Sequence, residues 1–162
     1  MEDLSKQTVA ELLGVAIRSE IDSNRIYSAW AEKLSNPLLK EKFQWLAKEE
    51  QKHKEILENL FTELHPDSEL HVPDQVPEAL MKGIAITPSS TLADFLFQAM
   101  ETEKSAETFY AKLAGRVDEG KKKILNYLSS VEHSHYMMLK SEYTVALAFE
   151  DYAEKGIDKV IT

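Results

Sequence analysis

The sequence predicts an all-α protein, a four-helix bundle made of two antiparallel helix pairs. Apolar residues recur at alternating spacings of three and four along four stretches of the chain. All glycines and prolines lie outside the middles of these stretches, except Gly14 near the start of the first. With 162 residues, 43% hydrophobic and 29% charged, the chain is expected to form one domain over residues 1–162.

The first two helices are delimited by their cap residues. Thr8 followed by Glu11 is the pattern of a capping box, which marks the start of the first helix. Asn36 followed by Pro37 ends that helix and starts the second, because asparagine caps a helix well and proline is tolerated in its first turn. The second helix is expected to stop before Pro66.

The segment after the second helix is too long for a hairpin loop. Residues 65–90 contain four of the five prolines and Gly83. A connection of this length is typical of a crossover that runs along a bundle and joins two helix pairs.

The second half of the chain repeats the organisation of the first. A capping pattern at Thr91 and Asp94 starts a third helix, which ends near Gly115. A fourth helix begins after Asp118 and runs toward the C-terminus, with a short extra helix near residues 144–155 as an alternative for its last part.

Each apolar stripe is interrupted near its middle by a glutamate, and two stripes also carry a histidine one turn later. Because these positions belong to the stripe that faces the core, the side chains should face one another inside the bundle. The six residues are Glu20, Glu50, His53, Glu103, Glu132 and His135.

A buried layer of four carboxylates needs positive charge beside it, since buried carboxylates lose hydration and repel one another. No interior position of the four stripes holds lysine or arginine. A pair of divalent or trivalent metal ions is therefore the simplest compensation. Residues three apart on a helix lie about 5–6 Å apart on one face, so one glutamate and one histidine can hold the same ion. Carboxylate and imidazole ligands suit iron, our first expectation, and also manganese or zinc.

An internal repeat supports this interpretation. Residues 16–27 (AIRSEIDSNRIY) match residues 99–110 (AMETEKSAETFY) with Ala, Glu and Tyr in register, and L-x-x-x-E-x-x-H recurs at 46–53 and 128–135. The repeated glutamates lie 83 residues apart in the first pair and 82 in the second. The alternative, solvent-facing glutamates and ordinary core histidines, would place these residues off four otherwise consistent stripes.

With these residues the chain resembles the rubrerythrin branch of the ferritin-like di-iron carboxylate proteins, over residues 8 to about 142. The resemblance implies a ferritin-like four-helix bundle around a carboxylate-bridged di-iron centre. It implies Glu50 and Glu132 as the bridges. The metal ligands that it implies are Glu20, Glu50, His53, Glu103, Glu132 and His135.

The chain departs from the family pattern in two respects. Rubrerythrins usually carry a rubredoxin-like domain whose iron is held by four cysteines, and this chain has no cysteine. Its electrons are therefore expected from an external donor protein. The family also tends to carry a further carboxylate one turn after the third-helix glutamate, where this sequence has Ala106 and the adjacent Glu107 points elsewhere. That difference weakens the case for a redox-linked ligand switch.

Tyr27 and Tyr110 occupy equivalent positions of the repeat, each seven residues after a ligand glutamate of its own stripe. A phenol there can hydrogen-bond a coordinating carboxylate and fix its orientation. We expect this role for both, with simple core filling as the alternative. Glu49 and Glu101 neighbour ligands in sequence but are expected to face solvent, as is His133.

Composition and charge exclude several classes of protein. A formal net charge of -9 argues against nucleic acid as a partner, since nucleic-acid binders need a basic face. The lack of cysteine removes disulfides, thiolate zinc sites and iron–sulfur clusters. No apolar run approaches the ~20 residues of a membrane span, and the acidic N-terminal segment is unlike a signal peptide. A cytoplasmic location is therefore expected.

The leading functional hypothesis is an oxidoreductase in which a reduced di-iron pair passes two electrons to hydrogen peroxide, or to dioxygen. The alternative is ferritin-like ferrous oxidation and iron storage, or plain metal binding. A metal-free helical interaction module is the third hypothesis. Assembly size separates the first two, because storage needs a hollow cage, whereas rubrerythrin-like enzymes are small homo-oligomers, with a dimer favoured here.

Overall fold

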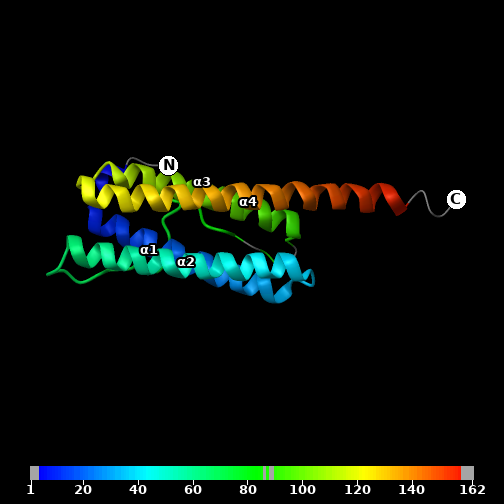
Figure 1. The fold of residues 1–162 in the computed structure, drawn as a ribbon, viewed down its shortest axis with the longest axis horizontal. Coiled ribbons are helices and arrows are strands. Elements are labelled where there is room, and N and C mark those ends of the chain that lie inside the picture. The colour runs from blue at the N-terminus through cyan, green and yellow to red at the C-terminus, as the bar shows by residue number, and fades with distance from the viewer. Residues whose placement is uncertain (1–3, 86, 88–89, 158–162) are drawn as a thin grey trace.

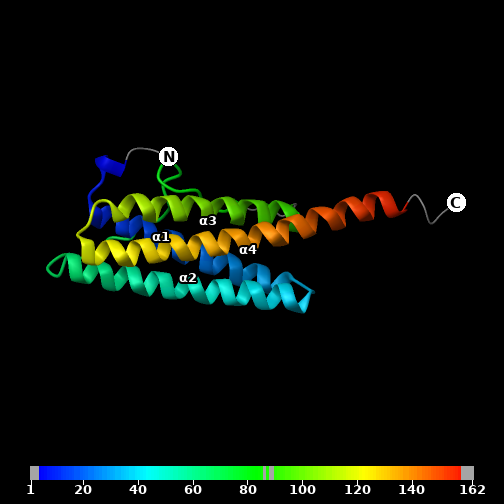
Figure 2. The same cartoon turned by 45° about the horizontal axis from the view of Figure 1, so that its top comes forward.

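The computed structural model describes residues 4–85, 87 and 90–157 and shows four long helices in this part of the chain. A short 3-10 helix, η1, precedes them. Figures 1 and 2 show α1 beside α2 and α3 beside α4, each pair antiparallel. The predicted all-α bundle of two helix pairs is confirmed. The elements are η1 Leu4–Lys6, α1 Val9–Lys33, α2 Pro37–Leu64, α3 Leu92–Ala114 and α4 Glu119–Ile157.

The predicted cap residues start the helices. Thr8 forms a complete capping box with Glu11 at α1, and Thr91 does the same with Asp94 at α3. The side chain of Asn36 accepts hydrogen bonds from the first free backbone amides of α2. These contacts satisfy donors that the helices cannot pair internally.

α4 continues without a break from Glu119 to Ile157, so the alternative of a separate helix near residues 144–155 is wrong. The physical reason lies in the sequence, which contains neither glycine nor proline between residues 121 and 155. In Figure 1 the last part of α4 projects beyond the ends of the other three helices.

The connection between α2 and α3 runs back along the bundle, as predicted (Figure 1). Its Leu80 and Met81 side chains are buried in the core beside α3 residues. The amide of Lys82 donates a hydrogen bond of 2.9 Å to Oγ of Ser105 on α3. The crossover is therefore part of the packed structure.

Gly14 of α1 is explained by this crossover. A Cβ atom at residue 14 would lie 2.1 Å from the carbonyl oxygen of His71, far inside van der Waals contact. Only glycine lets the backbone of the crossover pass so close to the helix.

Two apolar clusters fill the bundle, one on each side of its middle. The first includes Leu13 and Phe109, and the second includes Phe43 and Phe95. Both clusters draw residues from all four helices, so they hold the two pairs together. Along each helix the glutamates of the predicted layer lie between the two clusters. In the described part of the chain, no helix has the length and apolarity needed to cross a membrane.

Candidate metal centre

The six residues predicted to face one another do so. Each exposes 3% or less of its surface, and they form one polar layer between the two apolar clusters. α1 and α3 each contribute one glutamate, and α2 and α4 each contribute a glutamate and a histidine. The layer consists of Glu20, Glu50, His53, Glu103, Glu132 and His135.

The layer divides into two overlapping groups that could each hold a metal ion. Both groups share the carboxylates of Glu50 and Glu132. In each group the potential ligand atoms all lie within 4.8 Å of one another. The first group is Glu20, Glu50, His53 and Glu132, and the second is Glu50, Glu103, Glu132 and His135.

The two shared carboxylates each extend one oxygen toward each histidine. For Glu50, Oε2 lies 3.2 Å from Nδ1 of His53 and Oε1 lies 3.3 Å from Nδ1 of His135. For Glu132, Oε1 lies 2.8 Å from Nδ1 of His53 and Oε2 lies 3.3 Å from Nδ1 of His135. A carboxylate placed in this way can bridge two cations.

The unshared glutamates are arranged differently. Glu20 places Oε2 3.7 Å from Nδ1 of His53, and Glu103 places Oε2 3.8 Å from Nδ1 of His135. Each therefore faces one of the two histidines. The two halves of the layer thus have the same arrangement, as expected from the internal repeat.

The polar atoms of this layer lack the partners that buried polar atoms normally have. Within the described chain, Oε1 of Glu50, both carboxylate oxygens of Glu132 and Nδ1 of both histidines are buried and make no hydrogen bond of normal geometry, although Oε1 of Glu132 and Nδ1 of His53 are only 2.8 Å apart. Such groups are costly unless another ligand satisfies them. The described buried residues include no lysine or arginine. Carboxylate oxygens and imidazole nitrogens form a donor set that suits iron or manganese, so the residues fit a pair of metal ions.

The two tyrosines connect the halves of the layer. The Tyr27 hydroxyl donates a hydrogen bond to Oε1 of Glu103, and the Tyr110 hydroxyl donates one to Oε1 of Glu20. Burial, together with the charge of the partner glutamate, raises the pKa of each phenol well above its ordinary value. Both phenols therefore stay protonated and act as donors. The expected contact with a carboxylate of the layer is confirmed, and it crosses between the repeats.

Burial also changes the protonation of the carboxylates in the absence of metal. It raises the pKa of Glu20 to about 8, with a further contribution from the charge of Glu50. The pKa of Glu132 also rises to about 8, because of burial and the charges of Glu103 and Glu20. Protons thus replace part of the missing positive charge.

The histidines respond to the same surroundings. Burial alone lowers the pKa of His53, but the neighbouring carboxylates, Glu132 first, outweigh burial and raise it well above its ordinary value. For His135, burial likewise opposes protonation, while contacts with carboxylates, Glu103 first, raise the pKa to about 12. Both imidazoles are therefore protonated near neutral pH in the metal-free protein.

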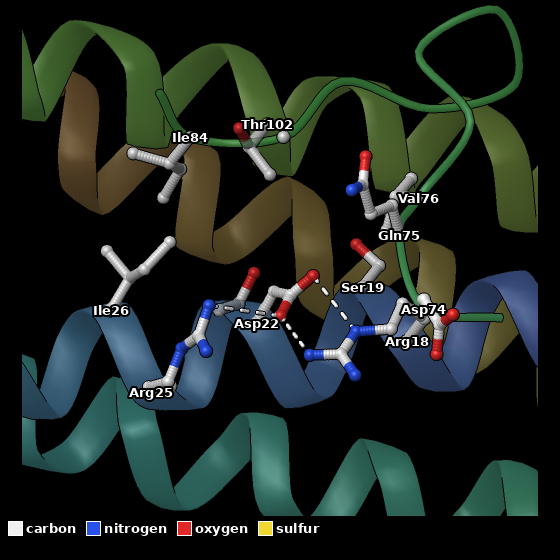
Figure 3. Close-up of a pocket in the computed structure, with 12 residues that line it drawn as sticks. Arg18, Ser19, Asp22, Arg25, Ile26, Asp74, Gln75, Val76, Ile84 and Thr102 are labelled. Atoms are coloured by element: carbon white, nitrogen blue, oxygen red, sulfur yellow. Dashed lines mark hydrogen bonds and ion pairs between the residues drawn. The ribbon is translucent and has the colours of Figure 1, made fainter. Parts of the chain in front are cut away.

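A cavity of about 280 Å³ lies on the side of the bundle where α1 and α3 face the crossover. Figure 3 shows Ser19 and Thr102, which lie next to the layer glutamates in sequence, among its lining residues. Arg18 and Asp22 form an ion pair at its edge. The cavity is adjacent to the predicted site but none of the six layer residues lines it.

Two residues near the layer were not predicted from the sequence. Glu49, expected to face solvent, exposes only 16% of its side chain and lies in a potential ligand group with His53 and His135. Trp45 packs against the ring of His135. Glu49 lies next to the predicted ligand Glu50 in the sequence, which is a signal, but the helix periodicity places it off the stripe.

The other expectations near the layer are confirmed. His133 has a side chain that is 51% exposed and contacts Glu107, which also pairs with Lys104. Glu107 thus points away from the layer, and Ala106 is buried. Glu101 is partly exposed at the surface, where it pairs with a lysine of the crossover.

Comparison with known proteins agrees with this geometry. The sequence model of the family described as Rubrerythrin matches residues 11–143. A solved structure of a hypothetical protein from Pyrococcus furiosus has 35% sequence identity and a TM-score of 0.81. The match covers 91% of this chain and 95% of that one. No curated protein sequence matches the chain.

Proposed function

The chain belongs to the rubrerythrin family, and from this membership and the geometry of the layer we propose that it is a di-iron oxidoreductase that reduces hydrogen peroxide with electrons from an external donor protein. One observation carries the proposal. Two four-residue groups overlap in two carboxylates, and each of these extends one oxygen toward each histidine. This is the arrangement needed for two metal ions held close together.

The residues of the layer have distinct roles in the proposed site. Glu50 and Glu132 would bridge the two ions. Glu20 with His53 would complete one ligand set, and Glu103 with His135 the other. When bound, the iron pair supplies the two electrons that, with two protons, convert one hydrogen peroxide into two waters.

The tyrosines hold the unshared carboxylates while the charge of the site changes. Each phenol donates to one oxygen of its glutamate, so the other oxygen is left to face the histidine side of the layer. Partners of this kind fix the orientation of ligands and tune their basicity. The Ala106 position offers no further carboxylate, so the ligand set proposed here has four glutamates.

Stopped-flow mixing of the anaerobic diferrous protein with hydrogen peroxide, and separately with dioxygen, tests the proposal. We expect faster oxidation by peroxide and consumption of about one peroxide per site, after which turnover stops for lack of a donor. Adding a reduced electron-carrier protein should restore turnover. Rapid oxidation by dioxygen with continued uptake of many ferrous ions would instead indicate iron storage.

Metal analysis and assembly size complete this test. Iron at two ions per chain is expected; manganese or zinc would change the proposed chemistry. We propose a small homo-oligomer, with a dimer favoured, and sedimentation analysis measures it. A hollow assembly of many subunits would contradict the peroxidase proposal and favour storage.

A further inference from the structure

One aromatic residue joins the buried layer to the protein surface. Trp45 of α2 packs edge-on against His135 of α4, with ring centroids 5.4 Å apart and an interplanar angle of 84°. His135 is completely buried, whereas Trp45 is 46% exposed. The ring of His53 lies 5.5 Å beyond that of His135 at an interplanar angle of 17°. Solvent, indole and both imidazoles are therefore connected by successive ring contacts.

The proposed reaction requires electrons to enter from the surface. Each peroxide consumes two electrons, and a chain without cysteine cannot hold a rubredoxin-type or iron–sulfur centre of its own. The proposed function takes these electrons from a separate donor, which must approach the buried layer closely enough for electron transfer. Trp45 offers such an approach, because its indole touches both solvent and His135.

We propose that electrons reach the metal centre through Trp45 and His135, from a one-electron carrier protein that docks over the exposed indole. This inference rests on the proposed function. In each transfer the carrier is oxidised by one electron and one ferric ion is reduced to ferrous, with no bond formed or broken. Two transfers restore the diferrous state.

The surroundings of Trp45 fit a protein partner. The residue lies where α2 and α4 are neighbours, as the ion pair between Lys42 and Glu142 shows one turn away. A second ion pair, between Glu49 and Lys52, lies on the same helix one to two turns after Trp45. An exposed aromatic residue bordered by charged pairs resembles the centre and rim of a protein interface, where tryptophan is enriched.

The repeat provides a matched control. Tyr127 of α4 is the equivalent of Trp45, 82 residues later, and is 58% exposed. Among the described residues its ring makes no contact with another aromatic or imidazole ring, in contrast to Trp45. The two halves therefore share an exposed aromatic position, but only the first half has a ring contact into the layer.

The lack of cysteine allows a photoreductant to be placed at one chosen site. A Glu41→Cys variant, labelled with a ruthenium photoreductant, carries it one turn before Trp45 on α2. Flash photolysis then measures the reduction of the diferric site by one electron. We expect Trp45→Leu to slow this rate severalfold, Trp45→Phe to keep much of it, and Tyr127→Leu to leave it unchanged.

Further readouts separate electron transfer from a purely structural role. Metal content should be the same in all variants, because Trp45 lies outside the ligand set, and the midpoint potential of the iron, measured in each variant, should change too little to account for the change in rate. A label at Lys104→Cys on α3 should give a rate that does not depend on Trp45. An unchanged rate in Trp45→Leu, or an equal loss in Tyr127→Leu, would overturn the inference.

The experiment does not use peroxide, so its result is distinct from that of the proposed function. Normal oxidation by peroxide, together with a photoreduction rate that does not change when Trp45 is replaced, would support the proposed function and reject this electron route. Photoreduction that depends on Trp45, in a protein that peroxide does not oxidise, would support this electron route and reject the proposed function.

Discussion

Tyr27 on α1 donates its hydroxyl hydrogen to Oε1 of Glu103 on α3, 76 residues later in the chain. The repeat-equivalent Tyr110 on α3 donates to Glu20 on α1. Each half of the molecule thus supplies the hydrogen-bond donor for a glutamate of the other half. The buried layer is therefore completed only when the two helix pairs pack together.

The first prediction concerns Tyr27→Phe. Removing the hydroxyl leaves a buried carboxylate oxygen of Glu103 without its donor, which typically costs about 1–3 kcal/mol. We expect a loss of this size in the free energy of unfolding of the metal-free protein, together with weaker binding of one of the two metal ions. Urea denaturation and metal titration measure the two effects.

Tyr136→Phe is the matched control for this prediction. The Tyr136 ring packs beside Lys104 and Lys140, and its hydroxyl makes no hydrogen bond within the described chain. We expect little change in either measurement, whereas Tyr110→Phe should behave like Tyr27→Phe. Equal stability of Tyr27→Phe and Tyr136→Phe would show that the phenol does not support the layer.

The second prediction is that metal binding releases protons. In the metal-free protein Glu20 and Glu132 have a pKa of about 8, and both histidines have raised pKa values. These four groups must lose their protons to act as ligands, so about four protons should be released per site near neutral pH. Calorimetric titration in buffers of different ionisation enthalpy counts them. Release of fewer than two would contradict the protonation pattern.

The third prediction concerns the pH dependence of stability without metal. The folded protein holds protons on Glu20 and Glu132 up to pH about 8, whereas the unfolded chain releases them near the ordinary value of 4.5. The raised pKa values of the two histidines also reduce folding stability as the pH rises above 6.5, the ordinary histidine pKa. Folding stability from the two carboxyl groups is therefore fully present below pH 4.5 and is lost as the pH rises through 8, and that from His135 is lost between pH 6.5 and about 12.

Melting temperatures of the chelator-treated and the metal-loaded protein test this sign. The chelated protein should melt at a lower temperature at about pH 9 than at about pH 6, while metal affinity should increase over the same range because protons compete with the ions. A chelated protein that gains stability with rising pH would disprove the assignment of protons to the layer.

The fourth prediction is that the two carboxylates proposed to bridge the ions, those of Glu50 and Glu132, contribute most to metal binding. A metal that binds only the folded state adds about 2.7 kcal/mol to stability at a hundredfold excess over its Kd. Glu50→Gln should lose most of this gain, because the residue belongs to both ligand groups. Glu20→Gln should lose less, and Glu55→Gln on the exposed face of α2 should lose none. Similar losses in Glu50→Gln and Glu20→Gln would argue against a bridging role for Glu50.

Much of the fold and of the layer could be predicted because local patterns determine them. The caps at Thr8, Asn36 and Thr91 depend on residues within one turn, and the stripe that carries each glutamate follows from helical periodicity. Each pattern occurs in both halves of the internal repeat, which gives a second, equivalent observation. None of these predictions depends on the axial register between neighbouring helices.

Contacts between the helix pairs could not be predicted in the same way. Seven residues along a helix span about 10 Å, so Tyr27 is two turns from Glu20 on its own helix. Helical side chains tilt back toward the N-terminus, which brings the phenol to the layer and next to Glu103 of the other pair. The contact of Trp45 with His135 likewise depends on the register between α2 and α4, which periodicity does not specify.

The last prediction concerns Gly14→Ala in α1. In an exposed helix interior, alanine is more favourable than glycine by about 1 kcal/mol, so propensity alone predicts stabilisation. In this protein the new Cβ would meet the carbonyl oxygen of His71 at 2.1 Å and its carbon at 3.3 Å. Both atoms belong to the backbone, which cannot move aside as a flexible side chain can. The crossover would have to lift from α1, although Leu80 and Met81 anchor it in the core. We therefore expect a net loss in the free energy of unfolding, measured by urea denaturation.

Gly83→Ala is the control for this prediction, because its Cβ would meet nothing within 4 Å, and the substitution should therefore change stability little. A Gly14→Ala variant more stable than the wild type would show that the crossover does not press against α1.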